Sequence, residues 1–229
     1  MSQWKKPTLQ HVMFRMEYPL NFSVPRMVGE FQTKLDLRGE LALAEDGLPE
    51  YRLFRRDDPD SLIRVTMKNF SYLTSNYGDW AEFKSRLMAL VDEFPLPLGN
   101  HEHLFIGLLY IDSIELYPRT VPLVPIDQYL QVSMKGPGRF GESPFRSAAW
   151  VTDYVLGPGN YQLQLRVETK PADDEGIEHL LVTTDTRIVG PDSTPMEEFL
   201  DKAHKDANDA YYSLLQPNLL QALKEGEAP

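Results

Sequence analysis

The chain has 229 residues, a net charge of −11 and no cysteine. The lack of cysteine excludes disulfides, thiolate metal sites and a cysteine nucleophile, and the negative charge argues against nucleic acid as a partner, because phosphate binding needs Lys and Arg. No apolar stretch follows the N-terminal lysines and no apolar run is long enough to span a bilayer, so we expect a cytoplasmic protein without a membrane partner.

In the first half of the chain we expect strands and two helices. Residues 9–18 alternate between polar and apolar side chains, which predicts a strand. Residues 78–94 carry an apolar stripe at helical spacing, and Asp79, with Glu82 three residues on, fits an N-cap with a capping box. The other expected elements are a loop bracketed by Pro19 and Pro25, a short helix over 28–37, and strands over 51–58, 62–69 and 70–76.

The second half is expected to repeat this order. Residues 193–215 predict a long amphipathic helix, which Ser193 or Thr194 would cap, with Pro195 in the first turn. The other expected elements are a strand within 103–117, a short helix over 124–131, a loop over 135–144, strands over 148–156, 161–169 and 179–189, and a short tail helix after Pro217.

This order of elements predicts an α+β protein whose antiparallel sheet has helices packed on one face. We expect residues 1–229 to form a single compact domain, because no long linker divides the chain. Two arrangements are open. Two successive β-α-β-β-β-α half units, over 8–95 and 101–215, would build a closed or saddle-like double unit, whereas the alternative is one irregular α+β domain.

The longest apolar run, from Leu104 to Ile111, predicts a central strand, because both of its faces are apolar and we expect both to be covered. Gly107 has no side chain, so we expect a helix or backbone to approach it closely. The residues expected to be almost wholly buried are Leu104, Ile106, Leu108, Leu109 and Ile111.

Asp112 follows this run, and two interpretations are open. The carboxylate belongs to a functional site, or it marks the end of the strand and accepts hydrogen bonds from backbone donors or from a nearby side chain, since an unpaired buried charge is costly. We favour the structural interpretation, because Asp112 and Ser113 are both residue types that bond nearby backbone where a strand ends.

Three segments together resemble a sporadically distributed bacterial family of uncharacterised proteins. IGLLYID (106–112) is similar to the family's central GLRYIN strand, although Leu109 replaces the family's arginine and Asp112 its asparagine. LDKAHKDANDAYY (200–212) resembles the C-terminal helix with its Ala203-His204 pair. In residues 70–87 the matching positions are Leu73, Thr74, Tyr77, Trp80, Phe83 and Leu87. The resemblance implies the fold and a setting in defence or mobile elements, and it names no reaction.

Candidate chemical groups are sparse. Asp201, His204 and Asn208 share one face of the last expected helix, beside Glu197, and an Asp-x-x-His pair can hold a metal or orient a general base. A metal needs three or more ligands, and neither this pair nor the His101 and His103 pair has a visible third ligand. We therefore expect no metal or cofactor, and a structural role for His204 at the edge of the core.

Two groups of cations have different expected roles. The cluster Arg52, Arg55, Arg56 and Arg64 is interrupted by Asp57, Asp58 and Asp60, which indicates a solvated face. The glycine-rich loop over 135–147 has side chains typical of contact surfaces. The residues expected to bind a partner there are Lys135, Arg139, Phe140, Phe145 and Arg146.

The leading hypothesis is a non-enzymatic interaction or accessory protein of the bacterial cytosol, in a defence or mobile-element system, with a protein partner. One alternative is a hydrolase or nuclease-like enzyme that uses Asp112, Asp201 and His204. Another is a small-ligand or nucleic-acid binder that uses the cavity of a saddle-like sheet. The sequence leaves the oligomeric state open.

Overall fold

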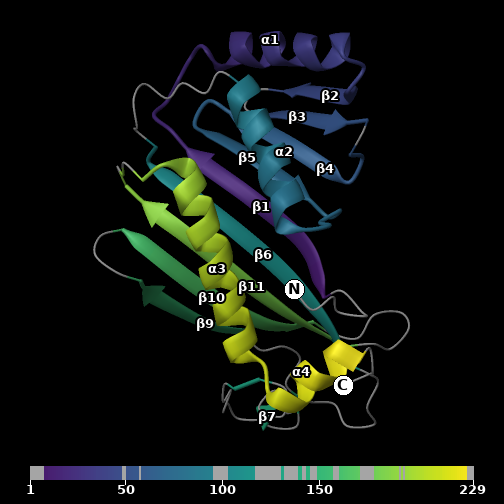
Figure 1. Cartoon of the computed structure of the whole chain (residues 1–229), viewed down its shortest axis with the longest axis vertical. Helices are drawn as coiled ribbons and strands as arrows, with labels where there is room; N and C mark the ends of the chain where they lie inside the picture. Colours follow the sequence, from purple (N-terminus) through teal and green to yellow (C-terminus); the bar gives the residue numbers. More distant parts are fainter. Residues whose placement is uncertain are drawn as a thin grey trace.

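The fold is α+β, with one open antiparallel sheet of nine strands and four helices in the described part of the chain (Figure 1). The computed structural model describes residues 8–47, 50–56, 58–94, 103–116, 130–131, 139–140, 143–144, 149–156, 160–170, 178–190, 192 and 194–225. The expected fold class and antiparallel sheet are thus confirmed.

The elements alternate between meandering strands and helices. The first of them are β1 (Leu9–Glu17), α1 (Val24–Leu37), β2 (Leu41–Gly47), β3 (Glu50–Arg55), β4 (Ser61–Thr66), β5 (Asn69–Thr74) and α2 (Trp80–Glu93). These are followed by β6 (Phe105–Leu116), β7 (Arg139–Phe140), β8 (Ser143–Pro144), β9 (Ala149–Val155), β10 (Tyr161–Lys170), β11 (Glu178–Val189), α3 (Met196–Leu214) and α4 (Pro217–Glu225).

The strand order in the sheet is β2-β3-β4-β5-β1-β6-β11-β10-β9, and β7 and β8 form a separate small hairpin. The strands from the first part of the chain therefore lie on one side of the β1–β6 pair, and those from the second part lie on the other. Phe14 lies opposite Leu108 at this central pairing. Whether the two parts are true structural repeats stays a prediction.

The helices cover one face of the sheet, and α2 and α3 cross it side by side with its strands behind them (Figure 1). Along β1, Val12, Phe14 and Met16 are fully buried beneath them, whereas His11, Met13 and Arg15 point to the opposite side. No described helix covers that opposite side, which we call the open face.

The expectation that β6 is covered on both faces is wrong. Ile106 and Leu108 are buried under the helices, but Leu109 and Ile111 lie half-buried on the open face. Leu104 precedes the strand and is 44% exposed. In the middle of a wide sheet, aliphatic side chains lose much of their exposure to cross-strand neighbours, so an apolar residue there does not require a covering layer.

The close approach at Gly107 comes from a side chain, and the expectation of a helix or backbone there is wrong. A Cβ added to Gly107 would lie 2.8 Å from Cε1 of Phe105. The guanidinium carbon of Arg15 lies 5.3 Å from the centroid of the same ring. The glycine therefore leaves room for the Phe105 ring on the open face, next to the guanidinium of Arg15.

Helix starts differ in how well they were predicted. The Asp79 cap of α2 is confirmed, since its side chain accepts the N–H of Glu82 at 2.9 Å. Helix α1 already begins at Val24 with Pro25 in its first turn, so the expected loop before Pro25 is shorter. The expected cap of α3 by Ser193 or Thr194 is wrong, because the N-cap is Pro195 and no described side chain makes a capping bond to this helix.

Some expected elements fall largely outside the described residues. From the helix expected over 124–131, the described part contains only Leu130 and Gln131, and Leu130 forms an isolated bridge with Leu215. Strand β2 was not anticipated. Among the described helices, none combines the length and apolar character that crossing a bilayer requires.

Leu108→Ala tests the position of β6. Leu108 is fully buried between β1 and the helices, so the substitution should lower the free energy of unfolding by about 2–5 kcal/mol. Leu109→Ala, on the open face of the same strand, is the matched control and should cost less. Denaturant unfolding measures both, and equal costs would contradict a one-sided core.

Candidate functional site

The buried polar groups of the covered face gather between α2, α3 and the central strands. We call this group the polar seam. It consists of Thr8, Trp80, Tyr110, Asp112, His204, Asn208 and Tyr211. Thr8 directly precedes β1, and the other members come from α2, β6 and α3. They include residues from all three segments that carry the family resemblance.

Asp112 lies inside β6, which continues to Leu116, so the expectation that it ends the strand is wrong. It is 7% exposed, and the Thr8 hydroxyl donates to its Oδ1 at 2.8 Å. The Tyr211 hydroxyl lies 3.1 Å from the same Thr8 oxygen. Burial raises the pKa of Asp112 to about 7, and the bond from Thr8 opposes that rise. The donor is thus a side chain 104 positions away in sequence.

The His204 ring contacts three neighbouring side chains. Its ring stacks on Trp80 with centroids 4.2 Å apart and an interplanar angle of 2°. The Tyr110 hydroxyl lies 2.7 Å from Nδ1, and Asn208 Nδ2 lies 3.0 Å from Nε2. Burial lowers the pKa of His204 to about 4, although the charge of Asp201 opposes the shift. The imidazole is therefore neutral near pH 7, and both of its nitrogens have neighbours.

Asp201 is engaged with α2. Its Oδ1 accepts the indole N–H of Trp80 at 3.1 Å, and its Oδ2 accepts a bond from Lys84 at 2.8 Å. Lys84 also pairs with Glu197 at 2.9 Å. The bond from Lys84 holds the pKa of Asp201 below its usual value. The Asp-x-x-His pair of α3 thus ties two helices together at a site where its groups already have partners.

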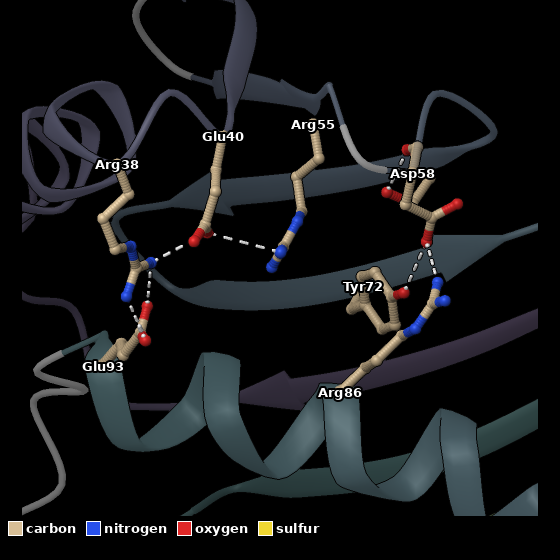
Figure 2. Close-up of polar contacts among 8 residues, drawn as sticks. Arg38, Glu40, Arg55, Asp58, Tyr72, Arg86 and Glu93 are labelled. Atoms are coloured by element: carbon tan, nitrogen blue, oxygen red, sulfur yellow. Dashed lines mark hydrogen bonds and ion pairs between the residues drawn. The ribbon is translucent and has the colours of Figure 1, made fainter.

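A second buried carboxylate, Asp58, was missed from the sequence (Figure 2). It is 2% exposed, although its neighbourhood was expected to be a solvated face, so that expectation is wrong for this residue. Arg86 donates to its Oδ2 at 3.0 Å and the Tyr72 hydroxyl donates at 3.1 Å. Burial, and then the charge of Asp58, raises the pKa of Tyr72 to about 12.

Figure 2 also shows an ion-pair chain that links α1, β3 and α2. Arg38, just after α1, makes two bonds to Glu93 at 2.6 and 2.7 Å. It also reaches Glu40 at 3.0 Å, and Glu40 lies 3.4 Å from Arg55. The Arg38 bonds hold the pKa of Glu93 below its usual value. Exposed pairs of this kind contribute little to stability, so we assign the chain an orienting role.

A shallow cleft lies beside Arg86, at the start of α2, and it has room for about one water molecule. It is smaller than the roughly 300–1,000 Å³ of ordinary ligand pockets. Arg86 is already bonded to Asp58 and Glu82, so it offers no free cation to an anionic ligand. The residues lining the cleft are Tyr72, Thr74, Asn76, Tyr77, Gly78, Glu82, Phe83 and Arg86.

The open face carries two neighbouring rows of side chains that run across the strands. One row is cationic and has small residues between its arginines. In register order it contains Arg52, Arg64, Ser71, Arg15, Gly107 and Arg187. The next row is apolar, and it contains Phe54, Leu62, Leu73, Met13 and Leu109. Residues directly opposite on paired strands are neighbours, so each row forms a continuous band.

Each arginine of the cationic row has a carboxylate partner. Glu50 lies 2.5 Å from both Arg52 and Arg64, and these bonds hold its pKa below the usual value. Arg15 pairs with Glu17, and Arg187 pairs with Asp185 at 3.3 Å and with Asp153 at 3.4 Å, so four carboxylates face the four arginines. Burial raises the pKa of Asp185, although Arg187 opposes that rise. The row is therefore polar and balanced in charge.

The expected binding loop lies mostly outside the described residues. Arg139 and Phe140 form β7, which pairs with Ser143 and Pro144 of β8. Their side chains are not described, and Lys135, Phe145 and Arg146 lie outside the described residues. The loop therefore stays a prediction.

His101 also lies outside the described residues, and His103 is 8% exposed. Within the described ranges, no group of three or more His, Asp or Glu side chains could hold a metal ion. Comparison of the chain with protein-family models and with curated proteins gives no match.

Asp112→Asn should remove a pH-dependent loss of stability. The folded pKa of about 7 lies above the unfolded value near 3.8, so in the native protein this group's contribution falls as pH rises from about 4 through 7. Such a shift corresponds to at most roughly 4 kcal/mol. Denaturant unfolding at several pH values should show that the free energy of unfolding of the variant, relative to that of the native chain, increases as pH rises. A constant difference would contradict the buried-carboxyl assignment.

His204→Phe should remove a loss of stability that the native protein shows at acid pH. The folded pKa of about 4 lies below the unfolded value of 6.5, so the native protein loses stability as pH falls from about 6.5 through 4. Phenylalanine keeps the stacking on Trp80 but cannot titrate, so that acid loss, of up to roughly 3 kcal/mol, should disappear. Denaturant unfolding curves of both proteins at pH 7 and pH 4 measure this loss of stability. An unchanged acid loss would place the responsible group elsewhere.

Proposed function

We propose that this chain is a non-enzymatic protein-binding module, an interaction or accessory subunit whose partner docks on the open face of the sheet. The observation that carries the proposal is the pair of neighbouring rows on that face. A band of five apolar residues crosses β3, β4, β5, β1 and β6, and a band of ion-paired arginines runs beside it.

This arrangement has the anatomy of a protein interface. Protein interfaces combine an apolar centre with a polar rim and are enriched in arginine and aromatic residues. Leu62, Leu73 and Met13 supply the apolar centre, and they are half-buried before any partner binds. Phe105, with Arg15 above its ring, adds an aromatic group next to the cationic row.

The charge balance of the face supports a protein partner over nucleic acid. Each arginine of the row is neutralised by a carboxylate on the same face, and the chain carries a net charge of −11. Polyanion binding would need an excess of unpaired cations that release counterions from phosphates. A partner with an amphipathic surface fits this face better.

The polar seam supports a structural role over the enzymatic alternative. An acid–base pair needs its groups to converge on a reacting atom. Asp112 is bonded to Thr8, His204 is stacked on Trp80 and bonded to Tyr110, and Asp201 is bonded to α2. The cleft beside Arg86 is also too small for an ordinary substrate.

The loop with Lys135, Arg139, Phe140, Phe145 and Arg146 remains a second predicted contact surface. A bacterial cytosolic location and a role in defence or mobile elements remain predictions that rest on the family resemblance. Both are compatible with an accessory subunit that acts through contacts.

The double variant Met13→Lys, Leu109→Lys tests the docking face. These two residues are opposite each other at the centre of the apolar band, so two cations there should prevent an apolar partner from seating. We expect at least a tenfold loss of specifically captured protein from a lysate of the native host, measured by quantitative mass spectrometry. The melting temperature should fall only modestly, because Leu109 also lies opposite Asp185, which offsets part of the repulsion between the two new lysines.

Two controls make the result specific. Leu37→Lys alters an exposed leucine of α1, which is 83% exposed, and should leave capture unchanged. Arg139→Ala with Phe140→Ala tests the loop separately. If only the loop variant loses the partner, docking belongs to the loop, and the open-face proposal fails.

A further inference from the structure

Strand β9 is one of the two edges of the sheet, and it pairs only with β10 among the described residues. The opposite edge, β2, is flanked by a helix, because α1 precedes it directly in the chain and lies alongside it (Figure 1). An uncovered edge presents unpaired N–H and C=O groups and is a template for another strand. Proteins that stay monomeric usually protect such an edge.

The sequence of β9 lacks the usual protection. It reads Ala-Trp-Val-Thr-Asp-Tyr-Val, which is rich in β-branched and aromatic residues and contains no lysine or proline. Val151 is 48% exposed, Tyr154 is 42% exposed and Val155 is 69% exposed. Its one charge, Asp153, accepts a bond from Gln164 at 2.9 Å and lies 3.4 Å from Arg187.

We propose that β9 is a self-association edge, on which the β9 strand of a second copy of this chain pairs antiparallel about a two-fold axis at Thr152. The pairing would join the two nine-stranded sheets into one continuous sheet. This surface is separate from the open-face docking site, so either proposal can hold without the other.

The register follows from which side chains share a face. Trp150, Thr152 and Tyr154 lie opposite Val167, Leu165 and Leu163 of β10, which are buried under the helices. The alternate residues of β9 therefore lie on the open face. A two-fold axis perpendicular to the sheet keeps these faces together only if it passes through one residue of β9.

Thr152 is the residue that makes this pairing self-complementary. An axis there places Thr152 against its own copy and Trp150 against Tyr154 twice, and Thr–Thr and aromatic pairs are both favourable across strands. On the open face, Val151 then lies opposite Asp153, and Ala149 lies opposite Val155. All seven residues of the strand are paired.

The neighbouring registers are worse. An axis at Asp153 would place two carboxylates directly opposite each other, which is destabilising. An axis at Val151 would leave Tyr154 and Val155 without opposing residues of β9, although they are among the most exposed apolar side chains of the strand. The geometry therefore selects Thr152.

Single cysteines test the register directly, because the chain has no cysteine of its own. Across an antiparallel pair, opposing Cα atoms lie about 4.5–5.5 Å apart, which is within the range for a disulfide. Thr152→Cys should therefore form a disulfide dimer rapidly under mild oxidation. Val155→Cys is the matched control on the same strand, and its two copies would lie about 20 Å apart, so it should cross-link at least tenfold more slowly.

A charge pair at Val151 gives an independent readout in solution. Val151→Lys places a cation opposite Asp153 of the second copy, whereas Val151→Asp places a carboxylate there. Both lose the same apolar contact, so we expect the aspartate variant to dimerise at least tenfold more weakly than the lysine variant by sedimentation equilibrium. Thermal melts of both variants check that each is folded.

Three outcomes overturn the proposal. One is an unmodified chain that stays monomeric up to about 100 μM, a concentration at which micromolar complexes form readily. In that case a strand of a different protein would be the remaining occupant of the edge. Another is equal cross-linking of the two cysteine variants, and the third is equal dimerisation of the two charge variants. A dimer that meets either of the last two conditions uses another surface or register.

Discussion

The antiparallel pairing of β1 with β6 joins the two paired strands of this sheet that lie farthest apart in the chain. It connects the strands β2 to β5 on one side with the strands β9 to β11 on the other. Closing so long a loop costs chain entropy, which must be recovered from the contacts that the pairing creates. Phe14 against Leu108 and Met16 against Ile106 supply buried apolar area at this point. The pairing also brings Thr8 next to Asp112, so the position of the buried carboxylate's donor depends on the same register.

A sheet with one covered face places special demands on the polar groups under its helices. A buried carboxylate or imidazole is costly unless it is hydrogen-bonded. Asp112 is bonded to Thr8, which directly precedes β1, Asp58 is bonded through Oδ2 to α2 and β5, and His204 contacts β6 and α2. Each of these bonds joins segments that are distant in sequence, and each would be lost if a helix or strand shifted by one position. We therefore interpret these groups as determinants of how the elements are assembled.

Local patterns predicted the parts of this fold that local physics controls. The alternation over 9–18 and the apolar stripe over 78–94 correspond to β1 and α2, and the Asp79 cap depends on a residue only three positions away. The prediction failed for the open face of β6, because apolar side chains in a wide sheet shield one another and imitate a covered strand.

The polar positions show a second limit of local patterns. Asp58 was missed because its neighbours are charged, while Arg86, which pairs with it, lies 28 positions away. The partner of Asp112 is 104 positions away. The arginine row could not be predicted from local patterns either, because its residues are distant in sequence. Only the strand register aligns Arg52 and Arg64 with Arg15 and Arg187.

The contrast between the covered face and the rest of the sheet supports the two proposed binding surfaces. On the covered face, Asp112, Asp201 and His204 are already bonded to neighbouring side chains, so a substrate would have to compete with the interactions that hold the fold. An open sheet instead leaves a face, whose apolar side chains are only half-buried, and an edge, whose backbone groups have no partner among the described residues. A face favours apolar contact and an edge favours backbone hydrogen bonds, so the two surfaces differ in their chemistry and can be occupied at the same time. For these reasons we propose binding at the open face and along β9 and not within the polar seam.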